Sequence, residues 1–127
     1  MANSYDSIEV LGQRLECAWL GPKPSNDPDG PPTLVFLHEG LGCVALWRDF
    51  PEQLVAATGL SGFVYSRQGY GGSEPCELPR PITYMHDEGL QVLPALLAAA
   101  GIKRAILVGH SDGASIALIY AGGTPSP

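Results

Sequence analysis

The sequence predicts an α/β fold, a three-layer sandwich built on a mainly parallel sheet. Three short apolar runs favour buried strands, and each is followed by a glycine-rich turn or by a stretch with helical spacing. Strands that alternate with helices in this way form parallel βαβ units with right-handed crossovers. At 127 residues, the chain has room for one domain with its own core and not for a second.

The first segment predicts a hairpin that precedes the βαβ units. Residues 7–20 alternate apolar and polar side chains on either side of Gly12, and residues 21–32 are rich in proline, glycine and polar residues, which indicates a loop. We therefore expect residues 1–127 to form a single incomplete domain. It combines the hairpin over residues 7–20 with core βαβ units over residues 33–122.

The remaining elements follow from periodicity and from strand-forming residues. Buried strands are expected over residues 33–38, 61–66 and 105–108. Helices are expected over residues 46–58, 84–100 and 114–123, and residues 122–127 should cap the last of them. Pro94 should kink the second helix or split it in two, because proline lacks the N–H donor that an uninterrupted helix requires.

Composition and charge exclude several classes of protein. The net charge is −6 and the seven Lys and Arg residues are scattered, so there is no basic patch for nucleic acid. No apolar run is long enough for a membrane span and no secretory leader is evident, which favours a cytoplasmic protein. The three cysteines have neither metal-ligand nor CxxC spacing, so we interpret them as free thiols and expect no metal and no organic cofactor. The sequence does not indicate an oligomeric state.

The residues that carry chemistry lie in the segment Gly109-His110-Ser111-Asp112-Gly113, which fits the pattern GxSxG. The pattern alone is common, and a serine that merely caps a helix is the simpler alternative. Here it lies between a predicted buried strand and a predicted helix. A serine on so tight a turn projects its hydroxyl above the sheet, so we interpret Ser111 as a nucleophile.

With this motif in place, the chain resembles the serine-nucleophile, esterase-like branch of the α/β-hydrolases. The motifs FLHEGLG, SRQGYGGSEP and VGHSDG occur in the family's order, each after a predicted strand. The resemblance implies an oxyanion hole formed by the backbone N–H of Asp112 and by that of either Gly40 or Leu41. Glu39 stands where many members have glycine, which leaves the choice between Gly40 and Leu41 open. The expected partner is a small-molecule substrate.

The rest of the catalytic triad is not evident. The resemblance implies the chain order serine, acid, histidine, yet no histidine and no carboxylate other than Asp112 follow Ser111. His38 is interpreted as structural, holding its loop by hydrogen bonds, and His86 as solvated or capping. We therefore expect the chain to be the N-terminal part of a truncated α/β-hydrolase fold, inactive alone.

Two functions remain open at this stage. The first is a serine hydrolase that acts on an ester or a related small molecule through an acyl-enzyme on Ser111. The alternative is a truncated, non-catalytic product that acts as a binding or assembly module. A serine at position 111 argues against the family branches that use aspartate or cysteine there, such as epoxide hydrolases and dienelactone hydrolases.

Overall fold

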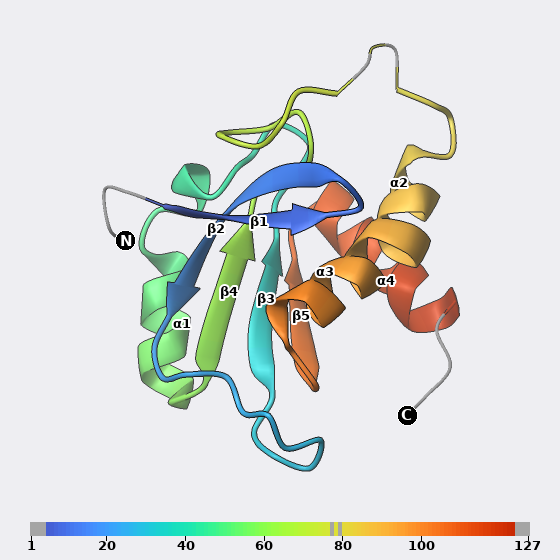
Figure 1. Ribbon diagram of the computed structural model, residues 1–127. Helices are drawn as coiled ribbons and strands as arrows, with labels where there is room; N and C mark the ends of the chain where they lie inside the picture. The colour runs from blue at the N-terminus through green and yellow to red at the C-terminus, as the bar shows by residue number, and fades with distance from the viewer. Residues whose placement is uncertain (1–4, 77, 79, 124–127) are drawn as a thin grey trace.

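One mixed sheet of five strands organises the molecule, in the order β1-β2-β4-β3-β5. The computed structural model describes residues 5–76, 78 and 80–123. The strands are β1 (Asp6–Val10), β2 (Gln13–Leu20), β3 (Thr33–Leu37), β4 (Ser61–Tyr65) and β5 (Ala105–Gly109). β4, β3 and β5 run parallel, whereas β2 pairs antiparallel with both β1 and β4. The sheet therefore joins a hairpin to a parallel core (Figure 1).

The predicted hairpin forms around a two-residue turn. Val10 pairs with Gln13, so Leu11 and Gly12 alone make the connection. Both have positive φ angles, +52° and +78°, as the twist of a two-residue hairpin requires. Glycine adopts this conformation freely, but Leu11 does so against a steric penalty because its Cβ crowds the backbone.

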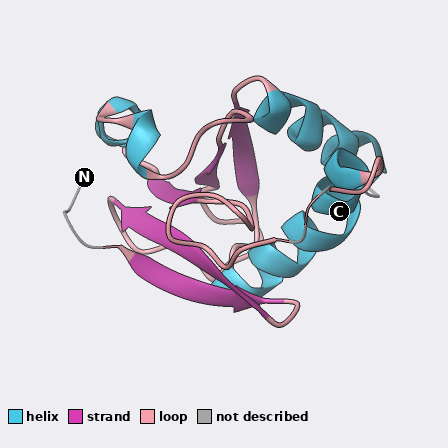
Figure 2. Cartoon of the chain, turned by 90° about the horizontal axis from the view of Figure 1, so that it is seen from above, coloured by secondary structure: helices cyan, strands magenta, loops and turns pink. Residues whose placement is uncertain are grey.

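Helices cover both faces of the sheet, which confirms the three-layer architecture (Figures 1 and 2). On one face, α1 (Phe50–Thr58) packs on β4 and β2, and its Val55 joins a core with Phe36 and Val64. On the other, α3 (Leu93–Ala100) and α4 (Asp112–Gly123) enclose the larger core. β3 and β4 are buried along their full lengths, as two covered faces predict.

Two of the expected helices depart from a single regular α-helix. The helix expected over residues 46–58 is a 3₁₀ turn, η1 (Ala45–Trp47), followed by α1, whose first turn contains Pro51. The helix expected over residues 84–100 continues without a gap through α2 (Tyr84–Asp87), a π-helical turn η2 (Glu88–Val92) and α3, with helical backbone angles at each junction, so Pro94 does not split it in two. Pro94 lies in the first turn of α3, where its missing N–H costs least. Of the residues expected to cap the last helix, 122 and 123 belong to α4, and 124–127 lie outside the described residues.

β5 corrects the expectation that all three core strands are buried on both faces. It pairs only with β3 and forms one edge of the described sheet, and the side chain of Ile106 is 45% exposed. Leu118 of α4 is also exposed, at 74%. The apolar run of β5 has the composition of a central strand, but no neighbour covers its outer side within the described residues.

The hairpin turn yields a direct test of backbone strain. Leu11→Asn should raise the free energy of unfolding by about 0.5–1 kcal/mol, because asparagine tolerates the left-handed conformation better than leucine and Asn-Gly is a favoured sequence for this turn. Urea unfolding of both proteins, followed by circular dichroism, measures the difference. A fall in stability would show that the exposed Leu11 side chain contributes more than its strained backbone costs.

Candidate active site

The turn between β5 and α4 holds Ser111 in an unusual backbone conformation. Its φ angle is +56°, in the left-handed region that residues other than glycine rarely adopt. The turn is anchored to β3 because the amide of His110 donates to the carbonyl oxygen of Leu37 at 3.1 Å. Ser111 itself is exposed. Strain of this kind collects at functional sites, and here it presents an accessible serine at the carboxyl end of the sheet.

Only glycine fits at the two ends of this turn. A Cβ on Gly109 would lie 2.6 Å from backbone atoms of Ala114, and a Cβ on Gly113 would overlap the carbonyl oxygen of Leu37. Both clashes are with backbone, so no change of rotamer relieves them. The two glycines therefore allow β5 and α4 to approach each other and β3 closely enough to form the turn.

The loop after β3 brings Gly40 against the first residue of α4. A Cβ on Gly40 would lie 2.6 Å from Oδ2 of Asp112, so the Asp112 carboxylate covers this stretch of loop. The side chain of Leu41, the next residue, is 87% exposed. Within the described residues, the amides of Gly40, Leu41 and Asp112 donate no hydrogen bond. The structure thus places Gly40 beside Asp112, with backbone donors available near Ser111.

His38 is fixed in one neutral tautomer by its two hydrogen bonds. The backbone N–H of Arg67 lies 2.9 Å from Nε2 of His38, and a backbone amide can only donate, so Nε2 accepts. Nδ1 therefore carries the proton and donates to the carbonyl oxygen of Glu39 at 2.7 Å. Burial, reinforced by the Arg67 charge, lowers the pKa of His38 from 6.5 to about 4. This residue braces the loop, and its nitrogens are not available to a nucleophile.

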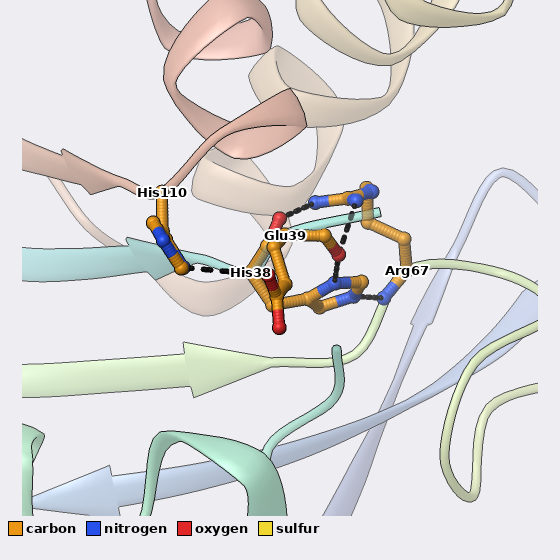
Figure 3. A network of polar contacts seen from close by, with 4 residues as sticks. All are labelled: His38, Glu39, Arg67 and His110. Carbon is orange, nitrogen blue, oxygen red and sulfur yellow. Dashed lines mark hydrogen bonds and ion pairs between the residues drawn. The ribbon is translucent and has the colours of Figure 1, made fainter. Parts of the chain in front are cut away.

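Arg67 is the residue of this region that the sequence analysis did not single out. Its side chain is fully buried, and its guanidinium donates to the carbonyl oxygens of His38 (2.6 Å) and Glu39 (3.2 Å), as Figure 3 shows. Its Nε donates to the hydroxyl of Tyr84 at 2.8 Å. In the sequence, Arg67 stands out only by its position after β4, inside the glycine-rich turn. That position is equally compatible with an exposed arginine, so it does not predict burial.

A small cavity opens beside the turn. It has a volume of about 90 Å³ and is lined by His38, Glu39, Gly42, Cys43, Leu46, Trp47 and His110. The Nε1 donor of Trp47 is buried without a hydrogen-bond partner in the described structure. At the rim, Nδ1 of His110 lies 3.8 Å from a carboxylate oxygen of Glu39, and both side chains are substantially exposed (Figure 3). Glu39, which stands where many family members have glycine, thus lies at the mouth of the cavity.

A buried carboxyl lies close to Arg67. Glu88 belongs to the π-helical turn η2, is 5% exposed, and its Oε2 has no partner among the described residues. Burial raises the pKa of Glu88 from 4.5 to about 7, an effect that the nearby positive charges of Arg67 and Arg80 reduce without cancelling. The hydroxyl of Tyr65 is also buried without a partner. Glu88 and Tyr65 interact electrostatically with each other and with Arg67.

Neither a metal site nor a membrane span appears in the described part of the chain. No group of three or more His, Cys, Asp or Glu side chains there is arranged to hold a metal ion. None of the described helices has the length and apolar character needed to cross a bilayer.

Comparison with known proteins places the fold. Residues 32–127 match the family described as alpha/beta hydrolase fold. An epoxide hydrolase A of Mycobacterium thermoresistibile is 28% identical, with a TM-score of 0.73 over 93% of this chain and 34% of that one. An epoxide hydrolase of Vigna radiata (22% identity, TM-score 0.72, covering 92% and 34%) and a membrane phospholipase A (23%, 0.73, covering 93% and 34%) share the fold.

These matches, together with the strand-turn-helix geometry at Ser111, identify the class. The chain belongs to the α/β-hydrolase fold family. It spans about a third of the length of the solved structures that it matches.

The turn glycines allow a matched pair of variants. Gly113→Ala should lower the free energy of unfolding by about 1–3 kcal/mol, because the new Cβ overlaps the backbone of β3. Gly122→Ala, in the same helix but with open space around it, should instead gain up to about 1 kcal/mol from helix propensity. Chemical unfolding measures both. Equal effects at the two positions would contradict the tight approach described for Gly113.

The buried carboxyl of Glu88 predicts a pH dependence of stability. Its pKa is higher in the folded protein than in the unfolded chain, so its favourable contribution is complete below pH 4.5 and is lost as the pH rises through about 7. Glu88→Gln should therefore gain stability relative to the parent between pH 5 and pH 8, by about 3 kcal/mol at most. Urea unfolding of both proteins at pH 5 and pH 8 measures this difference in the free energy of unfolding. The contribution of His38, which changes with pH in the opposite direction, is present in both proteins and therefore cancels. Parallel pH profiles of the free energy of unfolding for the two proteins would be inconsistent with a buried Glu88 whose pKa is raised.

Proposed function

We propose that this chain carries the nucleophile and the oxyanion amides of a serine hydrolase that cleaves an ester or a related small-molecule bond. The observation that carries the proposal is the positive φ of Ser111 on an exposed turn. A serine that only caps a helix normally adopts an extended backbone conformation with negative φ. The strained conformation has no purpose in capping, whereas it is what the presentation of a nucleophilic hydroxyl requires.

The proposed reaction proceeds through an acyl-enzyme. Oγ of Ser111 attacks the carbonyl carbon of the substrate while a general base takes its proton, and the carbonyl oxygen becomes an oxyanion. The amide of Asp112 and that of Gly40 or Leu41 donate hydrogen bonds to this oxygen. The bond to the leaving group then breaks, the leaving group receives the proton, and water releases the acyl group as a carboxylic acid.

The general base is proposed to come from polypeptide outside these 127 residues. Of the three histidines, His38 is held neutral with both nitrogens engaged, and none follows Ser111 in the sequence. The chain spans about a third of the matched structures, which leaves room for a base and its acid partner in the remaining length.

The solved structures do not by themselves select the reaction. Two of those compared are described as epoxide hydrolases and one as a phospholipase. Similarity at this level of identity supports a shared fold but not a shared reaction. Residue 111 favours the acyl-transfer reaction, since a hydroxyl nucleophile with nearby amide donors suits attack on a carbonyl. The nature of the substrate beyond this chemistry depends on the pocket.

The opposite proposal, a non-catalytic binding or assembly module, has one observation in its favour. The edge of β5 is unpaired among the described residues, and Ile106 and Leu118 expose apolar surface. Such an edge can pair with another strand without any chemistry. It does not account for the strain at Ser111, and the experiment below separates the two functions.

The test compares Ser111→Ala with Ser115→Ala in the whole protein. Ser111→Ala should abolish labelling by a fluorophosphonate probe and lower the hydrolysis of p-nitrophenyl acetate by about 10³-fold or more. Ser115 is exposed on the same helix, so Ser115→Ala should retain both. Full activity in Ser111→Ala would refute the nucleophile. A folded parent protein that neither reacts with the probe nor hydrolyses esters would favour the binding module.

A further inference from the structure

Arg67 is a buried cation that the fold retains at a cost. Its side chain is fully buried, and no carboxylate lies within ion-pair distance of it among the described residues. Removing an unpaired charge from water costs several kcal/mol, and an apolar side chain of similar volume would fill the same space more cheaply. What Arg67 gains in return is a set of charge-assisted hydrogen bonds to neutral oxygens, those of His38, Glu39 and Tyr84.

Those hydrogen bonds converge on one peptide group of the loop after β3. The carbonyl oxygen of Glu39 accepts from three donors: Nδ1 of His38 at 2.7 Å, the amide of Gly42 at 3.0 Å and Nη2 of Arg67 at 3.2 Å. Nη1 of Arg67 also holds the preceding carbonyl, that of His38, at 2.6 Å. The backbone amide of Arg67 fixes the ring of His38. Arg67 therefore holds the loop directly and through His38 (Figure 3).

Because the peptide group is planar, fixing the carbonyl oxygen of Glu39 also fixes the direction of the N–H of Gly40. In a trans peptide the C=O of one residue and the N–H of the next point in opposite directions. Fixing the carbonyl oxygen of Glu39 toward Arg67 consequently turns the N–H of Gly40 away from Arg67. Gly40 lies directly against Asp112, the residue that follows Ser111, and its amide donates no hydrogen bond within the described structure.

Because residue 40 is glycine, the hydrogen bonds that Arg67 and His38 donate to the Glu39 carbonyl are needed to hold the peptide in place, and we call this arrangement the clamp. The Glu39–Gly40 peptide is free to rotate about the flexible backbone of glycine, because no Cβ resists the motion. A rotation would replace the N–H by the carbonyl oxygen of Glu39, and an acceptor would then face the negative charge that forms on the substrate. The three donors to Glu39 oppose this rotation, and Arg67 is the only charged one, since His38 is neutral.

We propose that Arg67 is a positioning residue that aims the amide of Gly40 at the oxyanion formed on Ser111. The inference rests on the proposed role of Ser111 and selects Gly40 over Leu41 as the loop donor. Arg67 touches no substrate and acts through the loop backbone. The alternative is that Arg67 only stabilises the fold, which would leave the orientation of the Glu39–Gly40 peptide unchanged when the guanidinium is removed.

The kinetic test uses a pair of substrates that differ in their need for oxyanion donors. An aryl ester places negative charge on oxygen during attack, whereas the corresponding thionoester places it on sulfur, a much weaker hydrogen-bond acceptor. Arg67→Met should lower kcat for the ester by about 100-fold, as the loss of one oxyanion donor does, with little change in KM. The thionoester should lose far less, so the ratio of the two rates falls. A role in folding alone would lower both rates together.

Two further variants keep the kinetic test sharp. Arg67→Lys retains a positive charge but cannot hold both carbonyls with a planar fork, so it should show a smaller fall in the same ratio. Arg80→Met is the control: Arg80 donates to the carbonyl of Gln68 and lies over the rings of Tyr70 and Tyr84, with no bond to the loop. It should leave the ratio unchanged. A ratio that is unaltered in both Arg67 variants would overturn the proposal.

A structural measurement separates this proposal from the proposed function. In a crystal structure of Arg67→Met or Arg67→Lys without substrate, we expect the Glu39–Gly40 peptide to rotate or to occupy two orientations, while Ser111 keeps its positive φ. This outcome supports the clamp even if Ser111 proves inert. A peptide that retains its orientation in both variants refutes the clamp, whatever the activity of Ser111.

Discussion

The parallel pairing of β3 with both β4 and β5 is the constraint on which the site depends. The last residue of β3 lies opposite the last residue of each neighbour. Two residues beyond those ends come Glu39, Arg67 and Ser111. Three segments that are distant in sequence therefore bring the loop after β3, Arg67 and Ser111 together at one edge of the sheet, the carboxyl ends of its parallel strands. A shift of register by one residue would separate them, and the buried faces of β3 and β4 oppose any such shift.

The least favourable features of the fold are concentrated at that edge. Ser111 has a left-handed backbone, Arg67 is a buried charge, and Glu88 is a buried carboxyl with an unpaired oxygen. The left-handed conformation alone costs about 1–2 kcal/mol in a residue that has a Cβ. Left-handed residues other than glycine also occur elsewhere, at Leu11 in the hairpin turn and at Arg48 after η1. At this end of the sheet, however, such a residue occurs together with a buried charge and an unpaired buried carboxyl oxygen, and violations that gather in one place are typical of a functional site.

The sequence predicts some parts of this arrangement and not others, for reasons that can be named. Ser111 is predictable because its motif lies between a strand pattern and a helix pattern, whereas the helix expected to break at Pro94 instead continues through a π-helical turn. The clamp by Arg67 is not predictable, because its burial depends on a loop from another part of the chain. The edge position of β5 is also hidden, since an apolar run looks the same with one neighbour or two. The choice between Gly40 and Leu41 requires the orientation of a single peptide.

The most direct measurement is a crystal structure of the whole protein after reaction of Ser111 with a fluorophosphonate. The tetrahedral adduct carries an oxygen where the oxyanion of the reaction would form. If the account is right, this oxygen lies about 2.7–3.1 Å from the amide nitrogens of both Asp112 and Gly40. An adduct whose oxygen points into solvent, or is bound by other groups while the Gly40 amide faces away, would contradict it.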